Sequence, residues 1–509
     1  MSLLGLDVGT TGCKAAVFST DGHLLALAYE EYDLRSPEAG WAELDVTVVW
    51  EKIKTSIARA AAGSGSDPVT ALAVASLGEA VVPVRRDRRI LGPSLVNFDV
   101  RGQEYLEGLA SKVDNEHLYQ INGNTLGNLY SLTKLMWIRD HQPDLYAQTG
   151  YFLHWSSFVA FMLGADPVLD YSLANRTLLF DLDRATWSQE LAELSRIDLQ
   201  KLPRLVPSGV VVGTVARSIA QELGLPLNVT IVSGSHDQIA NAVGCGVIET
   251  GQAFYGMGSY HCITPVMNRR PDTSAMVARG LNTEHHAVPG KYVSFLYNHG
   301  GTLVKWYRNT FAALEHNQAK REALDIYPAL FAEMPERLSS VLVLPNFAST
   351  GPPEFLSDTC GVIFGLHLDT ARGDVLKGIV EGIGFYLKEC VVSLPSTGII
   401  INEYRVVGGG SKSDAWIQLS ADLFGQPIAR PVITEAGALG SAILAGVGSG
   451  VFADYPSGVQ AMVSLERTFD PDPIRQARYL TRFEQYRQLY AQLKGSLKAF
   501  HHSDHLGPA

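Results

Sequence analysis

The chain has 509 residues, a length at which a single hydrophobic core gives way to two or more domains. It is 46% hydrophobic and 18% charged, which are ordinary values for a globular protein. The formal charge of −11 argues against nucleic acid as the main partner, because phosphate contacts need a basic surface. No apolar run is long enough to span a bilayer, no basic signal-peptide region opens the chain, and the five cysteines form no CxxC pair. We therefore expect a cytoplasmic protein with free thiols that binds neither membranes nor nucleic acid.

The first predicted elements are three antiparallel strands over residues 3–7, 13–18 and 23–29, joined by glycine-containing turns. Asp45 is a favourable N-cap for an amphipathic helix that extends to residue 60. A strand over 71–75 and an apolar run over 81–84 follow, and Pro83 places that run on a sheet edge. Residues 104–163 are mainly helical, and residues 166–215 are mixed and rich in turns.

Near mid-chain, an apolar strand over residues 229–232 stops at Ser233-Gly234-Ser235, and Asp237 opens a helix-compatible run. This order places a carboxylate at the carboxyl end of a strand, where open α/β sheets bind ligands. Two interpretations stay open for Asp237. It could cap its helix, as aspartate commonly does, or it could act as a general base toward a substrate hydroxyl. His236 beside it could pack in the interior or line the site.

The second half opens with predicted strands over 252–255 and 260–264, around the glycine turn Gly256-Met257-Gly258-Ser259. A similar turn starts at Gly9, and the two are separated by close to half the chain. This spacing indicates two copies of one α/β fold that face each other across a cleft. A helix over 371–392, a strand over 404–407, a small-residue helix after Glu435 and a closing helix over 471–500 follow.

Several polar stretches could carry chemistry. The turn from Gly9 to Lys14 has glycines, two threonines and a lysine, the parts of a phosphate cradle, although a plain hairpin turn has the same glycines. The Gly408-Gly409-Gly410-Ser411 turn suits close approach of a flat ligand. Glu79 and the Asp99-x-Arg101 pair follow strands, where they could bind a substrate or form ordinary salt bridges.

Familiar phosphoryl-transfer motifs are missing from the sequence. It has neither the G-x-x-x-x-G-K-[ST] phosphate loop nor the H-R-D and D-F-G pair of protein kinases. The H-E-x-x-H zinc motif is also missing. We therefore interpret His285, His286 and the histidines near the C-terminus as surface residues and not as metal ligands.

Four stretches, in order along nearly the whole chain, resemble the FGGY family of carbohydrate kinases in the actin/hexokinase/heat-shock ATPase superfamily. The resemblance implies an α/β fold of two ribonuclease-H-like (actin-like ATPase) domains around a central cleft. The domains would be residues 1–246, which bind the sugar, and 247–500, which bind ATP, with a disordered tail at 501–509. The stretches are Leu6-Asp7-Val8-Gly9-Thr10-Thr11, Gly40-Trp41-Ala42-Glu43 with Trp50, Ser235-His236-Asp237-Gln238 with Gly244, and Gly408-Gly409-Gly410-Ser411-Lys412-Ser413 with Trp416 and Glu435-Ala436-x-Ala438-Leu439-Gly440.

By this resemblance the chain transfers the γ-phosphate of ATP to a sugar hydroxyl with the help of Mg²⁺. Asp237 would be the catalytic base, and Asp7 would help to hold Mg²⁺ through water. Nucleotide and phosphate contacts are implied for Thr10, Thr11, Lys14, Gly258, Ser259, Gly409, Gly410 and Ser411. Substrate contacts are implied for Glu79, Asp99, Arg101, His236 and Asp237.

The sugar loops depart from the patterns of well-known family members. Xylulose kinases carry Gly-Gln-Met-His-Gly at the first sugar loop and glycerol kinases carry Gln-Arg-Glu-Thr, whereas this chain has Ser76-Leu77-Gly78-Glu79. Asp99 and Arg101 fit a Trp-x-Asp-x-Arg-like element in which Asn97 replaces the aromatic residue. We expect a ketose such as xylulose, with fuculose, ribulose, gluconate and glycerol as alternatives.

Two hypotheses from other classes compete with the sugar kinase. One is an actin-like ATPase whose output is a conformational change or a polymer, and the other is a degenerate sugar-binding regulator. Retention of Asp7, Lys14 and Asp237 argues against the regulator. A homodimer is an assembly that the sequence leaves open.

Overall fold

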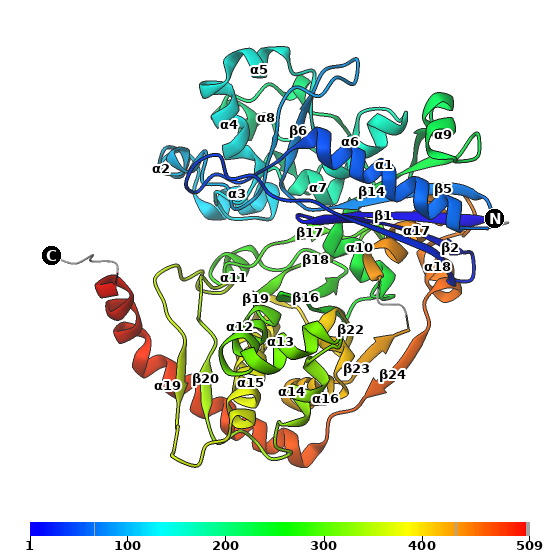
Figure 1. The fold of residues 1–509 in the computed structure, drawn as a ribbon. Helices are drawn as coiled ribbons and strands as arrows, with labels where there is room; N and C mark the ends of the chain where they lie inside the picture. The colour runs from blue at the N-terminus through cyan, green and yellow to red at the C-terminus, as the bar shows by residue number, and fades with distance from the viewer. Residues whose placement is uncertain (66, 433–434, 505–509) are drawn as a thin grey trace.

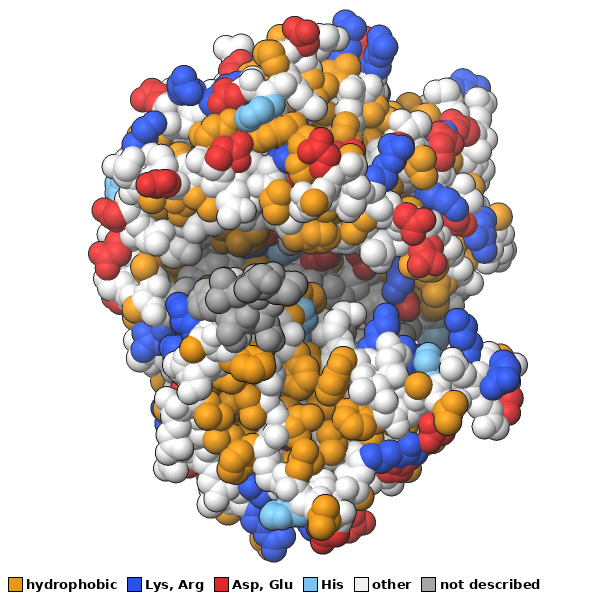
Figure 2. Space-filling view, turned by 60° about the vertical axis from the view of Figure 1, so that its left-hand side comes forward, with side chains coloured by type: hydrophobic (Ala, Val, Ile, Leu, Met, Phe, Trp, Pro, Cys, Tyr) orange, Lys and Arg blue, Asp and Glu red, His pale blue; other side chains and the backbone are white. Residues whose placement is uncertain are grey.

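The computed structural model describes residues 1–65, 67–432 and 435–504. They form two halves, each built on a mixed β-sheet (Figure 1). Figure 2 shows that the surface is hollowed between the two halves. No helix among the described residues has the length and apolar character needed to cross a membrane. The five cysteines, all within the described part of the chain, form no disulfide.

The sheet of the first half has six strands in the order β13-β14-β5-β1-β2-β3. β1, β5 and β14 run parallel, whereas β2 and β3 return antiparallel as the glycine-containing turns predict. β1 lies between two other strands, and its side chains are almost entirely buried. The strands span Ser2–Val8 (β1), Gly12–Ser19 (β2), Leu24–Glu31 (β3), Val69–Ser76 (β5), Val211–Thr214 (β13) and Thr230–His236 (β14).

The sheet of the second half repeats this connectivity, which confirms the two copies inferred from the glycine turns. β15 is followed by antiparallel β16 and β19, and then by β22 and β23, parallel to β15. The second turn itself consists of Gly258 and Ser259, because Gly256 still pairs within β15. The strands span Gln252–Met257 (β15), Tyr260–Met267 (β16), Leu296–His299 (β19), Glu403–Val407 (β22), Ile428–Pro431 (β23) and Leu465–Phe469 (β24).

Helices α1 (Val46–Gly63) and α6 (Trp155–Leu163) cover one face of the first sheet. Asp45 caps α1 as predicted, since its carboxylate accepts hydrogen bonds from the N–H groups of Thr47 and Val48. The apolar positions that repeat along α1 are buried toward β2 and β3. In this part of the chain, local sequence signals and tertiary packing agree.

The opposite face of the first sheet is covered by α17 (Ala436–Gly448), a helix from the second half of the sequence. It packs against β1, β5 and β14 (Figure 1). Leu439 and Ile443 of α17 share one buried cluster with Leu3, Phe18 and Val232 of that sheet. The division of the sequence at residue 246 therefore does not separate the two packing units, because the second half supplies a layer of the first.

Helix α10 (Asp237–Gly244) crosses α17 with the two backbones in contact. A Cβ atom on Gly440 would lie 1.8 Å from the carbonyl oxygen of Ala240. One on Gly244 would lie 1.9 Å from the carbonyl oxygen of Ala436. Only glycine fits at such distances. Because α10 ends the first half and leads to β15, this crossing forms part of the joint between the halves.

A smaller sheet, in the order β4-β7-β6-β8, lies at the outer end of the first half with helices packed on it. β6 is an inner strand, so the edge position predicted from Pro83 is wrong. The Pro83 carbonyl accepts a hydrogen bond from Leu91 N–H, on the side away from β8, and its missing N–H lies on that same side. The proline therefore removes no hydrogen bond to β8. The strands span Glu43–Leu44 (β4), Val81–Val84 (β6), Ser94–Leu95 (β7) and Tyr151–His154 (β8).

The predicted helical segment over 104–163 holds five helices, interrupted by β8: α2 (Leu106–Ala110), α3 (Asn115–Asn122), α4 (Ser131–His141), α5 (Pro143–Gln148) and α6. Helices α15 (Arg372–Val392), α16 (Asp414–Phe424) and α19 (Pro473–Asp504) pack in the second half. The chain is helical through Asp504, so residues 501–504 differ from the disordered tail expected from the sequence. The rest of that tail, 505–509, lies outside the described residues.

We expect Gly440→Ala to destabilise the protein, because its methyl group cannot enter without separating α10 from α17. The loss should be about 2–3 kcal/mol or more in the free energy of unfolding. Urea titration followed by circular dichroism measures it. Gly495→Ala is the matched control, since no atom of the described residues lies within 4 Å of a Cβ at this position in α19. Helix propensity there favours alanine by up to about 1 kcal/mol. Equal effects of the two substitutions would contradict the close-contact interpretation.

Candidate active site

Asp237 lies where β14 meets α10. β14 does not stop at Val232, as its Ser/Gly content predicts, but continues to His236 with a shift in register against β5. His236 occupies the N-cap position and Asp237 is the first helical residue. Its Oδ1 accepts a hydrogen bond from Gln238 Nε2 at 3.1 Å. The helix-cap interpretation of Asp237 is thus wrong, and its side chain stays 23% exposed at the strand end.

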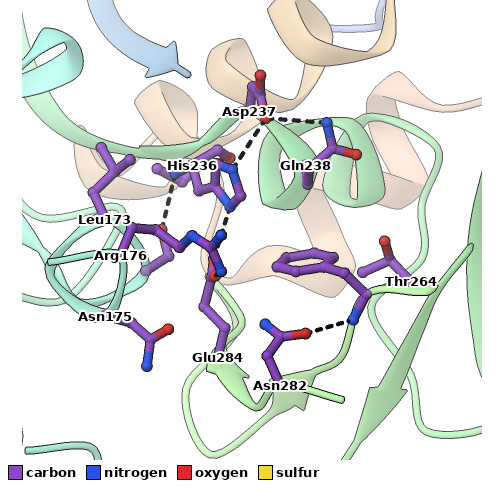
Figure 3. A network of polar contacts seen from close by, with 12 residues as sticks. Leu173, Asn175, Arg176, His236, Asp237, Gln238, Thr264, Asn282 and Glu284 are labelled. Atoms are coloured by element: carbon purple, nitrogen blue, oxygen red, sulfur yellow. Dashed lines mark hydrogen bonds and ion pairs between the residues drawn. The ribbon is translucent and has the colours of Figure 1, made fainter. Parts of the chain in front are cut away.

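His236 connects Asp237 to a glutamate of the second half (Figure 3). Its Nε2 lies 3.4 Å from Asp237 Oδ1, and its Nδ1 lies 3.0 Å from Glu284 Oε1. Glu284 belongs to β17 (Glu284–His285) and is fully buried. Burial lowers the pKa of His236, but Glu284 and then Asp237 outweigh this effect and raise the pKa to about 9. His236 is therefore a cation at neutral pH, placed between two carboxylates.

Arg176 and Glu79 extend this group. The Nε of Arg176 donates to Glu79 Oε1 at 2.8 Å, and its Nη2 contacts the same oxygen. Its Nη1 lies 3.7 Å from Glu284 Oε2. Arg176 follows α7 (Tyr171–Asn175), Glu79 follows β5, and both side chains are less than one-tenth exposed. We call Glu79, Arg176, His236, Asp237 and Glu284 the charge cluster. It has one more carboxylate than cations.

The electrostatics of the charge cluster act directly on Asp237. Burial raises the pKa of its carboxyl above the ordinary value, and the imidazolium of His236 opposes that rise. A carboxylate tuned in this direction is a better proton acceptor than a fully solvated one. Gln238 and His236 both contact Oδ1, so Oδ2 is the atom available to a substrate.

Asp7 lies near the end of β1, below the first turn of α17. A Cβ on Gly437 of that helix would be 2.7 Å from Asp7 Oδ2. Burial, and then the charge of Asp237, raise the pKa of Asp7 to about 7, while Lys14 opposes the rise. Lys14 Nζ forms an ion pair with Glu435 Oε2 at 2.6 Å, just ahead of α17. The two aspartates thus lie close enough for the negative charge of Asp237 to raise the pKa of Asp7.

The predicted phosphate turns come from both halves. Thr10 and Thr11 lie in the turn between β1 and β2, which is closed by a hydrogen bond from Gly9 N–H to the Gly12 carbonyl at 2.9 Å. Ser259 lies in the turn between β15 and β16 and is exposed. This turn is tied to the start of α12 (Gly301–Phe311) through its backbone carbonyls.

A pocket of about 750 Å³ opens beside the turn at Gly258 and Ser259. Gly409 and Gly410 also line it, whereas Ser411 is buried, with its Oγ donating to the Gly408 carbonyl at 2.8 Å. The size and mixed lining suit a flat, partly apolar ligand such as a nucleoside. The other lining residues are Gly301, the apolar Met257, Val304, Pro328, Phe331, Ala332, Ala415 and Trp416, and the polar Thr302, Lys305, Asp325, Tyr327, Lys412 and Ser413.

Two predicted substrate residues form a separate network. The fully buried Asp99 accepts hydrogen bonds from Ala42 N–H at 2.6 Å and from the Arg101 guanidinium. Arg101 also donates to Glu43 Oε2 at 2.9 Å and lies 4.0 Å from the Trp41 ring. Asp99 and Arg101 therefore hold the Trp41-Ala42-Glu43 stretch in place, and their polar atoms are directed to it and not to the charge cluster.

The sequence interpretation missed Arg176 and Glu284, which take part in three of the four ion pairs of the charge cluster. Neither lies in a recognisable motif, and only the fold brings them together. Glu284 directly precedes His285 and His286, which were expected at the surface. That expectation is wrong, because His286 is buried and desolvation lowers its pKa to about 3, and His285 bonds to the Leu182 carbonyl at 2.9 Å.

The architecture, two duplicated halves with a hollow between them, matches that of solved sugar kinases. The xylulose kinase of Rhodospirillum rubrum superposes with a TM-score of 0.86 and 25% identity, covering 99% of this chain and all of the other. The gluconate kinase of Lactobacillus acidophilus has the same fold, with a TM-score of 0.87, 21% identity and coverage of 98% and 99%. The fold class expected from the sequence is thus confirmed.

The models of the FGGY family of carbohydrate kinases match residues 2–244 with the N-terminal domain and residues 256–449 with the C-terminal domain. The chain belongs to this family and is a sugar phosphotransferase. Among curated relatives, the autoinducer-2 kinase of Klebsiella pneumoniae is 27% identical, covering 97% of this chain and 94% of that protein. The xylulose kinase of Bacillus subtilis is 25% identical (98% and 99%), and the glycerol kinase of Koribacter versatilis is 29% identical (97% and 98%).

Arg101→Ala should destabilise the protein strongly, because it leaves the buried carboxylates of Asp99 and Glu43 without their cation. The expected loss is about 3–5 kcal/mol in the free energy of unfolding, read from chemical denaturation. Arg184→Ala is the control, since Arg184 is 82% exposed in its ion pair with Asp181 and should contribute less than about 1 kcal/mol. A stable Arg101→Ala protein that binds sugar poorly would instead favour a substrate contact.

The stability contributed by His236 should depend on pH. Its pKa in the folded protein, about 9, lies above the ordinary 6.5, so the contribution is complete below about pH 6.5 and is lost as the pH rises through about 9. The change amounts to about 3 kcal/mol. Unfolding free energies of the wild type and His236→Gln should therefore differ by less at about pH 9.5 than at about pH 6. Parallel profiles across that range would contradict the cationic state of His236.

Proposed function

We propose that this chain is an ATP-dependent kinase of a ketose such as xylulose, and that Asp237 is its catalytic base. The position of Asp237 supports this assignment most. It is a partly exposed carboxylate at the carboxyl end of β14, with Oδ1 held by Gln238 and His236. In this position Oδ2 can accept a proton from a hydroxyl bound between the two halves.

In the proposed reaction, Asp237 Oδ2 accepts the proton of the sugar hydroxyl as its oxygen bonds to the γ-phosphorus of ATP. The bond between that phosphorus and the bridging oxygen of ADP breaks. Positioning and charge stabilisation contribute most of the catalysis in phosphoryl transfer, and a general base contributes a further factor of about 10²–10⁴. Approach of the two halves would exclude water, so that the sugar and not water receives the phosphate.

ATP is assigned to the pocket of about 750 Å³ in the second half, with its phosphates directed toward Asp237. Gly409 and Gly410 would contact the nucleoside, and Ser411 would support them from below. The remaining predicted residues would approach the phosphates from two sides: Thr10, Thr11 and Lys14 from the first half, and Gly258 and Ser259 from the second. Residues 1–246 would bind the sugar and residues 247–500 the nucleotide. Helix α17 belongs to the second range but packs on the sheet of the first.

Asp7 fits a role with Mg²⁺. This ion usually keeps several waters and is held by one or two carboxylates together with substrate phosphates. Asp7 is a partly buried carboxylate whose pKa is raised by its surroundings, so a nearby cation would favour its ionised form. Within the described residues, no group of three or more His, Cys, Asp or Glu side chains forms a metal site of its own. When bound, Mg²⁺ would offset the phosphate charge, and Asp7 would hold it through water.

The identity of the sugar rests on relatives. Xylulose kinases are similar over nearly the whole chain, and autoinducer-2 and glycerol kinases are similar to a like degree. Glu79 and His236 are proposed to border the sugar, because both are in the charge cluster with Asp237. For Asp99 and Arg101 we propose an indirect role, in which they hold the Trp41 loop that closes this side of the first half.

Asp237→Asn keeps the shape of the side chain but removes the proton acceptor. With xylulose and MgATP, a coupled assay of ADP release should show a decrease in kcat of about 10²–10⁴-fold. Thermal unfolding and ATP affinity by calorimetry should stay close to the wild-type values.

Asp454→Asn is the matched control, since Asp454 is an exposed N-cap residue of α18 (Tyr455–Met462), away from the charge cluster. It should leave kcat unchanged. Wild-type turnover in Asp237→Asn would exclude this residue as the base. ATP hydrolysis that no sugar stimulates would overturn the kinase proposal itself.

A further inference from the structure

Both cations of the charge cluster are already committed to protein carboxylates. Arg176 bonds to Glu79 through Nε and Nη2 and faces Glu284 through Nη1. His236 bonds to Glu284 through Nδ1 and approaches Asp237 through Nε2. Figure 3 shows Glu284 below His236 and beside Arg176, in contact with both. An incoming anion would thus find each positive charge already neutralised.

Among the described groups around the charge cluster, Asp170 and His154 supply no positive charge, and two nearby lysines are already bonded within the protein. Asp170, the N-cap of α7, is buried, and burial raises its pKa to about 6, so it is mainly ionised at neutral pH. Burial lowers the pKa of His154 to about 3, so its ring is neutral. Burial lowers the pKa of Lys134 to about 8, so it stays a cation at neutral pH, but it is only 2% exposed and its Nζ contacts the backbone carbonyl of Asn128. Lys14 is paired with Glu435.

The available hydrogen-bonding groups also discriminate between substrates. Ionised carboxylates only accept hydrogen bonds, so the hydroxyls of a sugar, which donate, suit Asp237 and Glu79. A substrate carboxylate brings only acceptors and a second negative charge. Like charges within about 4–6 Å raise each other's energy, and more so where burial limits screening.

We propose that the sugar site is built for an uncharged polyhydroxy substrate and rejects aldonates, with Glu284 as the positioning residue that sets this preference. The inference rests on the proposed function of the same site. Glu284 is fully buried, so it acts through Arg176 and His236 and does not touch the substrate. Within the described residues its Oε2 has no hydrogen-bond partner, and its charge is balanced by Arg176 at 3.7 Å.

Glu284 reaches the site from the second half, whereas the other four members belong to the first. Neighbouring contacts hold β17 in place: Thr283 N–H donates to the Gly123 carbonyl at 2.7 Å, and Thr283 Oγ1 bonds to Tyr119 at 2.6 Å. Removing the charge of Glu284 should leave this docking intact. It would release Nη1 of Arg176, a cation that can then pair with an anionic ligand.

The test compares kcat/KM of the full chain, with MgATP, across three classes of compound. These are the ketoses D-xylulose and D-ribulose, the polyols xylitol and D-glucitol, and the aldonates D-xylonate and D-gluconate. Each aldonate differs from its polyol only by a carboxylate in place of a hydroxymethyl group. For the wild type we expect the best neutral compound to exceed both aldonates by about 100-fold or more.

Glu284→Gln should reduce the ratio of kcat/KM between the best neutral compound and the aldonates by about tenfold, because it uncovers positive charge at the site. Glu79→Gln is a second variant that frees Arg176 and should shift the ratio in the same direction. Glu249→Gln is the matched control, since Glu249 pairs with Lys291 at the surface with 58% of its side chain exposed. A purely structural effect would lower kcat/KM for all classes equally and leave the ratio unchanged.

Three outcomes would overturn the inference, and they are distinct. A wild type that uses an aldonate as well as any neutral compound overturns the substrate class but leaves the kinase in place. Equal ratios in Glu284→Gln, Glu249→Gln and the wild type overturn the role of Glu284. ADP release that none of the six compounds stimulates, in protein whose thermal unfolding is cooperative, overturns the proposed function and this inference with it.

Discussion

Helices α10 and α17 cross with their backbones in contact, and the geometry of the cleft depends on that crossing. α10 begins with Asp237, and the first turn of α17 lies over Asp7. The distance between these two carboxylates is thus set by how closely the helices approach, which Gly244 and Gly440 permit. Ile239 and Val243 of α10 also share a buried apolar cluster with Leu439 of α17, so apolar packing holds the crossing at that distance.

The charge cluster depends on the same joint for a different reason. Its four members from the first half hold two cations and two carboxylates, and Glu284 is added when β17 docks beside them. Buried ion pairs contribute little net stability, because desolvation offsets much of the attraction. Their value here is to orient side chains and to hold His236 charged beside Asp237. The ionisation of the site is therefore complete only when both halves are in place.

Local signals in the sequence predicted much of the fold and part of the site. The glycine turns, the N-cap at Asp45 and the position of Asp237 depend on a few neighbouring residues, and the structure shows each of them. Arg176 and Glu284 could not be found in this way, because their ion pair joins positions that only tertiary packing brings together. For Asp99 and Arg101, a spacing of two residues after a strand suits a substrate site and a structural ion pair equally well. The end of β14 was misjudged because Ser233 and Gly234 favour turns, whereas pairing with β5 extends the strand.

The position of α17 late in the sequence has a consequence for folding during synthesis. The first sheet is made from residues that leave the ribosome early. One of its faces remains exposed to solvent until residues 436–448, which form α17, have been synthesised. During synthesis the nascent first half would expose Leu3, Phe18 and Val232, which the finished protein buries against that helix. Long-range contacts of this kind slow folding and favour aggregation of the unfinished chain. A product that ends near residue 246 would lack this cover permanently, so the protein gains a stable first half only when most of its second half exists.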